Sequence, residues 1–502
     1  MPDNVSERLF TIVWRNDPDL AVEAGHLPPV LWEDLSPRHR DETVLAAEAL
    51  IAELDDQGDV PERQAARYHA DCTRSLVKWR GIDMLNHMTG PAARLSWAAA
   101  SWPWAADPNA EMYVERLREF PAFCDAVVRQ SEHWDTPGSR PVLDGFIAQV
   151  DAIMRTPATT ALPGGATPRE VADGVSSGLL ALRSLAVKAL TSARPGSPLA
   201  QVPDGPERYA DAIHRGTSLP MSAARVESLG HTVLSRTQER YERLLQSHSA
   251  GFELLPSAAS YLERMREIHA RLVAALPAVS SKLPRMACEV TAMPEANATV
   301  GPPAYYGPSS QHNGRAGSLY VNMAEPVTVR DWDVLPLAMH EGVPGHHLQL
   351  ALLDENQSLP DTVRLLSVNA FTEGWAVYSE TLAPVLGLEL TAADEFGLLT
   401  HQRWRAARLV VDVGLHVHGW SVDTAVTFMV EQTGLDRVAL RREVIRYLAW
   451  PGQALGYMVG AEAVSSWVAA QRARGVPLAT AHADLLQRGS IPLSVLAAHG
   501  QD

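Results

Sequence analysis

The chain has 502 residues, 46% of them hydrophobic and 20% charged, a composition typical of a globular protein with two or three domains. The formal net charge of −16 argues against nucleic acid and anionic membrane surfaces as partners. Three scattered cysteines, the absence of a secretory pattern in Met1–Arg8 and the absence of an apolar run of membrane length predict a cytoplasmic protein without a disulfide framework.

The first 290 residues show apolar positions at intervals of three and four, which is typical of one amphipathic helix after another. A stretch rich in Pro, Gly and Ser, Ala193–Pro206, interrupts this pattern and predicts a loop or linker. We therefore expect a mostly α fold, with a helical N-terminal region over residues 1–290 and a second region over residues 291–502. Examples of such periodic segments are Asp41–Leu54, Arg140–Met154, Pro168–Leu190, Ala223–Leu245 and Ala258–Leu276.

One motif in this helical region suggests a serine hydrolase and is rejected on its context. Gly174–Gly178 matches the Gly-x-Ser-x-Gly nucleophile elbow. That elbow requires a sharp turn from a strand into a helix, and here the motif lies inside a long helical pattern without a preceding strand.

The sequence pattern changes at residues 301–322. Gly and Pro are frequent around Tyr305 and Tyr306, and Ser318–Asn322 alternates like a short strand. This pattern predicts a small hairpin or sheet, and Tyr306 is a candidate substrate contact on the wall of a cleft.

His340-Glu341-Gly342-Val343-Pro344-Gly345-His346-His347 resembles a stretched zinc-hydrolase motif. In the usual His-Glu-x-x-His motif, two imidazoles on one helical face hold Zn²⁺ and the Glu accepts a proton from the bound water. Here the position four residues after His340 is Pro344, which cannot ligate a metal. Pro344 also predicts a kink or bulge, since it lacks an N–H and its ring clashes with the preceding turn.

The second ligand is therefore His346 or His347. On a regular helix His347 returns to the face of His340 after about 10.5 Å of rise, near the limit for two histidines that share one metal. A widened turn, to which Gly345 offers little resistance, would bring His346 into place instead. We favour His346 as the ligand and expect His347 to contact the substrate or to support a ligand.

The next helical segment, Asn369–Glu380, supplies a third ligand candidate. Phe371, Trp375 and Tyr378 recur at helical spacing and predict a buried helix, where a carboxylate is unfavourable unless it is paired or bound to metal. Glu373 is the candidate ligand, and Glu380, two turns later, is placed to orient a ligating histidine.

The C-terminal motifs supply candidates for catalysis and substrate binding. Tyr457 follows a Pro-Gly break, the kind of irregular backbone that lines sites, and is a candidate site residue with Tyr447 as its rival. Arg446 could hold a substrate carboxylate, although such an Arg is more often a structural ion-pair partner. His416 is a candidate donor to substrate or transition state, at even odds with a buried structural histidine, and its i,i+2 spacing to His418 favours a strand or loop.

Five segments together resemble a known family. They are His340–Gln349, Thr372–Glu380, Val411–His416 with Gly419–Ser421, Arg446–Tyr447 and Trp450–Tyr457, and they are similar to the bacterial domain-of-unknown-function family 885. That family is similar to thimet oligopeptidase and carboxypeptidase Taq. Glu373-Gly374-Trp375-Ala376 also resembles the segment that carries the zinc-binding Glu in gluzincins.

The resemblance implies a metallopeptidase-like fold in which the helical N-terminal half walls a deep cleft over a zinc site. It also implies an edge strand, here Ser318–Asn322, that pairs with extended substrate, and an oxyanion role for Tyr457. Gln453, in the last of the five segments, is a further candidate substrate contact.

We therefore expect a zinc-dependent hydrolase of short peptides or related amides. Zn²⁺ would be held by His340, His346 and Glu373, with Glu341 as general base and then acid. The alternative is a non-catalytic zinc-binding scaffold that retains a relict metallopeptidase site. The substrate, the direction of cleavage and the oligomeric state do not follow from the sequence.

Overall fold

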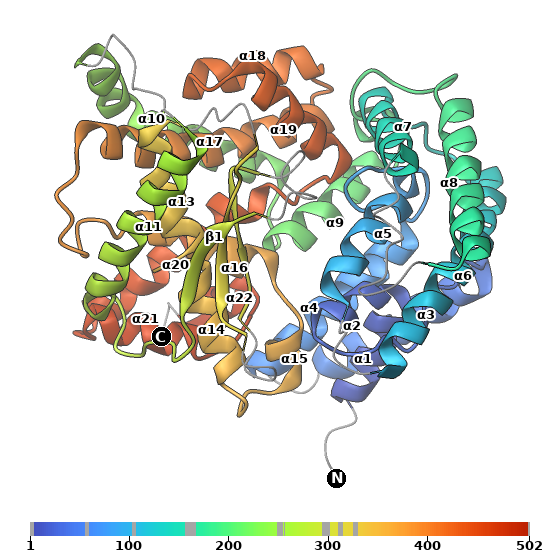
Figure 1. Ribbon diagram of the computed structural model, residues 1–502, viewed down its shortest axis with the longest axis horizontal. Coiled ribbons are helices and arrows are strands. Elements are labelled where there is room, and N and C mark those ends of the chain that lie inside the picture. Colours follow the sequence, from blue (N-terminus) through green and yellow to red (C-terminus); the bar gives the residue numbers. More distant parts are fainter. Residues whose placement is uncertain are drawn as a thin grey trace. The chain divides into compact units, whose positions relative to one another are not determined.

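The computed structural model describes residues 5–55, 60–102, 107–155, 167–247, 255, 257–293, 302–309, 315–324 and 330–499. The described chain is mostly helical, with one small sheet, which confirms the predicted fold class (Figure 1). It divides into two compact units, which are described separately: unit 1 comprises residues 1–215, 411–430 and 435–452, and unit 2 comprises residues 216–410, 431–434 and 453–502. This division has a boundary at residue 215, and none at the predicted residue 290.

Unit 1 is built from helices that pack around large aromatic side chains such as Trp32, Tyr113, Phe120 and Phe146. Gly174–Gly178 lies inside α8, so the described structure has no strand before it and no nucleophile elbow. The helices are α1 (Val5–Asn16), α2 (Pro18–Glu23), α3 (Pro37–Asp55), α4 (Pro61–Lys78), α5 (Pro91–Ser101), α6 (Asp107–Gln130), α7 (Arg140–Arg155), α8 (Arg169–Ala189), α9 (Gly205–Thr217), α18 (Val422–Thr433) and α19 (Arg437–Ala449), of which the ends of α9 and α18 belong to unit 2.

Unit 2 contains the stretched zinc motif, residues 340–347, and the candidate ligand Glu373. Its helices are α10 (Ala223–Ser247), α11 (Ala258–Ala275), α13 (Asp331–Glu341), α14 (His346–Glu355), α15 (Asp361–Leu365), α16 (Asn369–Glu380), α17 (Ala392–His416, with its last residues in unit 1), α20 (Leu455–Ala473), α21 (Leu478–Leu486) and α22 (Leu493–His499). Its strands are β1 (Cys288–Ala292), β2 (Ala304–Gly307) and β3 (Gly317–Val321).

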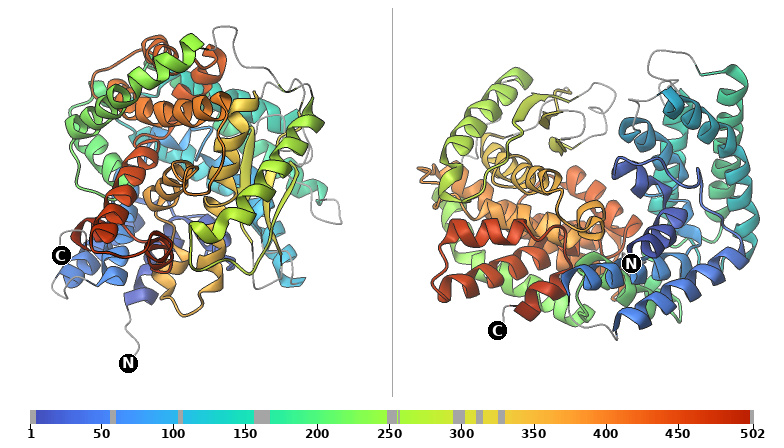
Figure 2. Two further views of the ribbon diagram at one scale, coloured as in Figure 1. Left: turned by 90° about the vertical axis from the view of Figure 1, so that its left-hand side faces the viewer. Right: turned by 90° about the horizontal axis from the view of Figure 1, so that it is seen from below.

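The sheet of unit 2 has the order β1-β3-β2, with β3 parallel to β1 and antiparallel to β2. Helix α11 packs against β1, β3 and α13, as Figures 1 and 2 show from three sides. The predicted strand Ser318–Asn322 corresponds to β3, but its predicted role as an edge strand is wrong. Because β3 is paired on both sides, the outer strand of the described sheet that lies beside α13 is β2.

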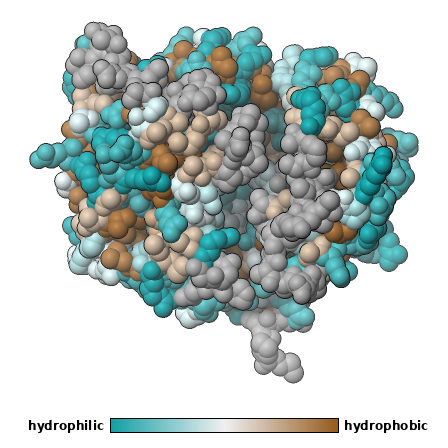
Figure 3. Space-filling view, viewed as in Figure 1, coloured by the Kyte–Doolittle hydropathy of each residue, from teal (hydrophilic) through white to brown (hydrophobic). Residues whose placement is uncertain are grey.

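The surface bears exposed apolar side chains on several helices, among them Leu45, Trp97 and Val438. On the face seen in Figure 3, hydrophobic and hydrophilic residues are intermixed over the described part of the chain. Among the described helices, none combines the length and the apolar character needed to cross a membrane.

Candidate metal centre

Three side chains from helices α13, α14 and α16 of unit 2 converge on one point. His340 lies at the end of α13, His346 at the start of α14 and Glu373 in α16, and one potential ligand atom from each lies within 4.8 Å of the others. The Oε2 of Glu373 is 3.4 Å from His340 Nε2 and 3.7 Å from His346 Nε2. Among the described residues this is the one group with such an arrangement of ligand types.

The donor set suits a zinc ion. Two imidazole nitrogens and one carboxylate are a common three-ligand set for catalytic zinc, and they leave a fourth position for water. Glu373 Oε2 is buried and accepts no hydrogen bond from the described residues. Burial alone would raise the pKa of Glu373, but the two histidines hold it well below its usual range, so the group is an anion. A buried anionic oxygen of this kind is stabilised by a cation, either a metal ion or a protonated histidine.

A break in the helix creates this convergence. Helix α13 ends at Glu341, residues 342–345 form turns that contain the cis Val343–Pro344 bond, and α14 begins at His346. The predicted distortion at Pro344 is therefore a complete interruption. Gly345 is necessary for this path because a Cβ there would lie 2.0 Å from His340 O and 2.3 Å from Met339 O. The chain thus folds back tightly onto the last turn of α13.

His346 and His347 differ in their contacts. Both ring nitrogens of His347 are engaged elsewhere: Nε2–H donates to Met286 O at 3.1 Å, and Nδ1 accepts from the Tyr306 hydroxyl at 2.9 Å. Burial lowers the pKa of His347 to about 4, which keeps the ring neutral. Of the two, the structure brings His346 to Glu373.

His340 is oriented from behind by a second carboxylate. Its Nδ1 lies 2.8 Å from Glu380 Oε1, and a donated Nδ1–H leaves Nε2 free to face Glu373. Burial by itself would lower the pKa of His340, yet Glu373 and Glu380 outweigh it and raise that pKa to about 9. Arg405, on α17, lies 3.2 Å from the same oxygen of Glu380 and helps to keep this buried carboxyl ionised.

The residue beside the first ligand, Glu341, is held by the edge of the sheet. Its Oε2 accepts a hydrogen bond of 2.9 Å from the Tyr306 amide of β2. The carboxylate therefore has a fixed direction and retains acceptor capacity at its other oxygen.

Tyr457 lies beside the cluster. Its ring is nearly parallel to that of His340, with centroids 6.4 Å apart, and the Arg408 guanidinium lies 4.5 Å from the Tyr457 centroid. The approach of α20, which carries Tyr457, to α16 depends on two glycines. A Cβ on Gly374 would lie 2.4 Å from Gly460 Cα, so the two backbones are in contact.

The candidate substrate contacts of unit 2 differ in their surroundings. Tyr306 is the strand residue that links Glu341, through its amide, to His347, through its hydroxyl. Gln453 is mostly buried, and its amide donates to Asn369 Oδ1 at 3.2 Å, at the start of α16.

The other three candidates belong to unit 1 and contact one another. His416 Nε2–H donates to Tyr447 O at 3.1 Å, and its Nδ1 accepts from Ser197 Oγ at 2.7 Å. Arg446 and the Tyr447 hydroxyl both bind Glu443, at 3.0 and 2.9 Å. His416 is the last residue of α17, so the expectation of a strand or loop there is wrong. The catalytic and substrate roles of His416, Arg446 and Tyr447 stay predictions.

The sequence did not predict the buried charged residues that contact Glu380. Besides Arg405, His401 of α17 lies 4.0 Å from Glu380 Oε2 and also contacts Asp333 of α13. The sequence of α17 gives little signal for this, because its charged residues resemble those of an exposed helix face, although Arg405 and His401 are buried.

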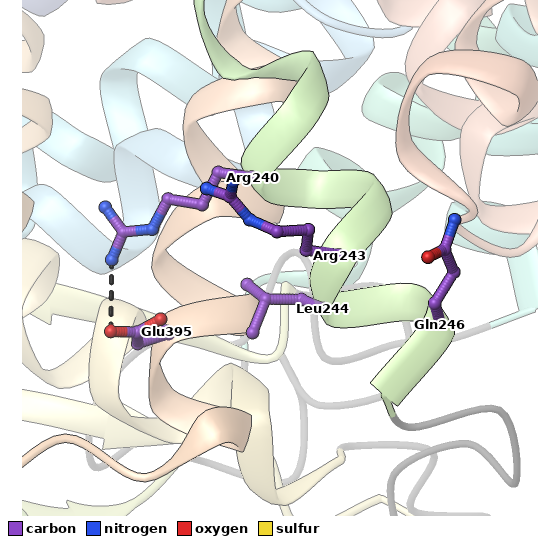
Figure 4. Close-up of a pocket in the computed structure, with 5 residues that line it drawn as sticks. All are labelled: Arg240, Arg243, Leu244, Gln246 and Glu395. Atoms are coloured by element: carbon purple, nitrogen blue, oxygen red, sulfur yellow. Dashed lines mark ion pairs between the residues drawn. The ribbon is translucent and has the colours of Figure 1, made fainter.

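A separate pocket of unit 2 contains none of the cluster residues. It is lined by the α10 side chains Arg240, Arg243, Leu244 and Gln246 together with Glu395 of α17, which pairs with Arg240 at 3.1 Å (Figure 4). Both members of this ion pair are more than a third exposed, which is typical of a solvated surface pair.

Comparison with known families gives a match over residues 18–499 to the family described as "Bacterial protein of unknown function (DUF885)". The chain belongs to this family. The match extends the resemblance, which rested mainly on residues 300–465, to nearly the whole length. The curated proteins gave no match to the DUF885 chain.

Two solved structures have the same fold as this DUF885 protein. The "putative lipoprotein from Colwellia psychrerythraea" is 22% identical, with a TM-score of 0.85 over 99% of this chain and 98% of that one. The "putative lipoprotein of unknown function from Shewanella oneidensis" is 15% identical, with a TM-score of 0.72 over 99% of both chains. These similarities establish the fold and leave the chemistry to be argued from the cluster.

Proposed function

We propose that this protein is a zinc-dependent hydrolase of peptide or related amide bonds that acts on short peptides. The observation that carries the proposal is the convergence of His340, His346 and Glu373 within 4.8 Å, with Glu341 directly after the first ligand. Bound zinc would supply a water of lowered pKa and polarise the scissile carbonyl. The remaining work falls to side chains of the protein.

Glu341 would accept the proton of the attacking water and deliver it to the leaving amine. Its hydrogen bond from the Tyr306 amide supports this role, because a fixed carboxylate can present one oxygen to the water throughout the reaction. The Tyr457 hydroxyl would donate a hydrogen bond to the oxygen of the scissile carbonyl as negative charge develops on that oxygen. The closeness of its ring to His340 supports that assignment.

Strand β2 would align the substrate. It is the edge of the sheet next to α13, and an extended peptide can add to such an edge through main-chain hydrogen bonds. This placement replaces the role first expected of Ser318–Asn322. His347, Gln453, His416, Arg446 and Tyr447 are retained in the proposal as substrate contacts or donors.

The similarity to gluzincin metallopeptidases, the deep cleft and the cytoplasmic location remain part of the proposal. A cleft would explain a preference for short peptides over folded proteins. The two structural relatives are described as putative lipoproteins, so cell fractionation with an antibody is the direct check of the location.

The deciding experiment combines metal analysis with digestion of a peptide library. We expect about one zinc per chain and cleavage of short peptides by the wild-type protein. Glu341→Gln should keep zinc and lose turnover, since the amide is nearly isosteric but cannot accept the proton. Glu395→Gln, at the exposed pair of Figure 4, is the matched control and should remain active. A protein that binds zinc but cleaves nothing would instead be a zinc-binding scaffold.

A further inference from the structure

Helix α16 contributes more to the cluster than Glu373. It donates hydrogen bonds to backbone carbonyls next to both histidines. The Trp375 indole Nε1–H lies 2.9 Å from Pro344 O and 3.3 Å from Gly345 O, in the break that precedes His346. The Ser379 hydroxyl lies 3.1 Å from Met339 O, which belongs to the peptide bond before His340, and 2.7 Å from Ala376 O in its own helix.

These carbonyls occur where a helix normally loses its internal hydrogen bonds. Among the described residues, Met339 O and Pro344 O accept no backbone amide, whereas Gly345 O is the first acceptor of α14 and already receives the Gln349 N–H at 3.2 Å. A buried carbonyl without a donor is unfavourable, so each donor from α16 favours one position of the chain. Trp375 and Ser379 are fully buried, and their donors are therefore shielded from competition with water.

The contact from Trp375 lies at the point where the motif departs from the regular four-residue spacing. In a continuous helix, the helical period alone would place the second histidine on the same face as the first. Here the backbone is interrupted at Gly342–Gly345. Backbone hydrogen bonds from α13 and α14 hold Gly342 and Gly345, and Pro344 O between them is held by Trp375. Trp375 is only two residues from Glu373, so one rigid helix carries both a candidate ligand and the donor that holds the break.

We propose that Trp375 is a positioning residue for the metal centre, with Ser379 in a smaller supporting role. By holding the Pro344 and Gly345 carbonyls, Trp375 sets His346, and not His347, against Glu373. The stretched motif thus depends on an indole N–H from another helix where the usual motif depends on helical periodicity. This inference rests on the proposed zinc site and concerns how the protein builds it.

The test measures zinc affinity of the purified full-length protein by competition with a chromogenic chelator. Trp375→Phe keeps a large aromatic ring and removes the N–H. We expect it to weaken zinc binding roughly 10- to 100-fold, the usual loss when a group that orients a ligand is removed. The Co²⁺-substituted variant should also show an altered visible absorption spectrum, because the ligand geometry changes.

Trp467→Phe is the matched control. Trp467 is also buried, on α20, and its Nε1 has no hydrogen-bond partner among the described residues, so this change removes a similar ring volume without removing a hydrogen bond. It should retain wild-type zinc affinity even where its melting temperature falls. Ser379→Ala, a much smaller change, should weaken zinc binding less than Trp375→Phe and keeps the test possible should that variant not fold.

The outcomes separate this inference from the proposed function. Wild-type zinc affinity and an unchanged Co²⁺ spectrum in Trp375→Phe, or in Ser379→Ala where only that variant folds, overturn the positioning role and leave the hydrolase proposal intact. A wild-type protein that binds no zinc overturns both. Weakened binding in Trp375→Phe with normal binding in Trp467→Phe supports the inference, even if no peptide is ever found to be cleaved.

Discussion

The Nδ1 of His340 lies 2.8 Å from a carboxylate oxygen of Glu380, on the side of the ring away from Glu373. This contact fixes both the tautomer and the direction of the ring. We expect Glu380→Ala to weaken zinc binding about 10- to 100-fold, and Glu380→Gln to weaken it less because its amide oxygen still accepts the hydrogen bond. Chelator competition measures both. Equal and unchanged affinities would remove Glu380 from the centre.

Removal of the ligands themselves should distinguish the two adjacent histidines. His340→Ala, His346→Ala and Glu373→Ala each delete one of three candidate ligands and should lose stoichiometric zinc in elemental analysis. His347→Ala should retain it, since both ring nitrogens of His347 bind other groups. Retention by His346→Ala together with loss by His347→Ala would reverse the assignment.

The metal-free protein should lose stability as the pH rises. The pKa of His340 is raised from 6.5 to about 9 in the folded state. Its protonated form therefore stabilises the fold fully below about pH 6.5, and this contribution disappears as the pH rises through about 9. We expect the melting temperature of metal-free protein to fall over this range, and the fall to be smaller in His340→Gln. Identical pH profiles for both proteins would contradict the assignment.

Zinc binding should follow the opposite trend. The metal competes with the proton at His340, so affinity should increase between about pH 6.5 and 9 as that proton is lost. Isothermal titration in buffers of different ionisation enthalpy would detect the released proton. A binding reaction that releases no proton near pH 7 would show that His340 is not a ligand.

Tyr457→Phe tests the oxyanion donor. A phenol that binds charge present only in the transition state should, when removed, lower kcat by roughly 10²- to 10³-fold with little change in KM. Zinc content should stay constant. Tyr447→Phe, whose hydroxyl binds Glu443, is the comparison and should lose less. If Tyr447→Phe were the crippled variant and Tyr457→Phe were active, the role would pass to Tyr447.

The sequence predicted the parts of this centre that depend on local rules. The helical period identified α3, α7, α8, α10 and α11, and the ligand chemistry of His340, His346 and Glu373 predicted that they form one cluster. The interruption at Pro344 was expected as a distortion of one helix, because the proline signal gives the position of a break and not its extent. The sequence alone could not show that both ring nitrogens of His347 bind other groups, which is the structural reason to favour His346.

Features set by long-range packing could not be predicted in this way. A strand pattern cannot tell a central strand from an edge strand, and so β3 was given the role that the position of β2 allows. The side chains of Arg405, His401 and Asp333 that surround Glu380 come from residues far apart in sequence. The charged residues of their helices have the pattern of solvent-exposed positions. Helix α17 continues to His416, although the spacing of His416 and His418 had favoured a strand or loop there.

The backbone contact between Gly374 and Gly460 limits how this protein can be altered. Because α16 and α20 meet main chain to main chain at this point, there is no side chain here that can be trimmed to widen the space between the two helices. Substitutions at either glycine force the helices apart and disturb ligand and phenol together. A directed-evolution library aimed at new substrates should therefore spare both helices and start at Tyr305 of β2, which is none of the three candidate metal ligands.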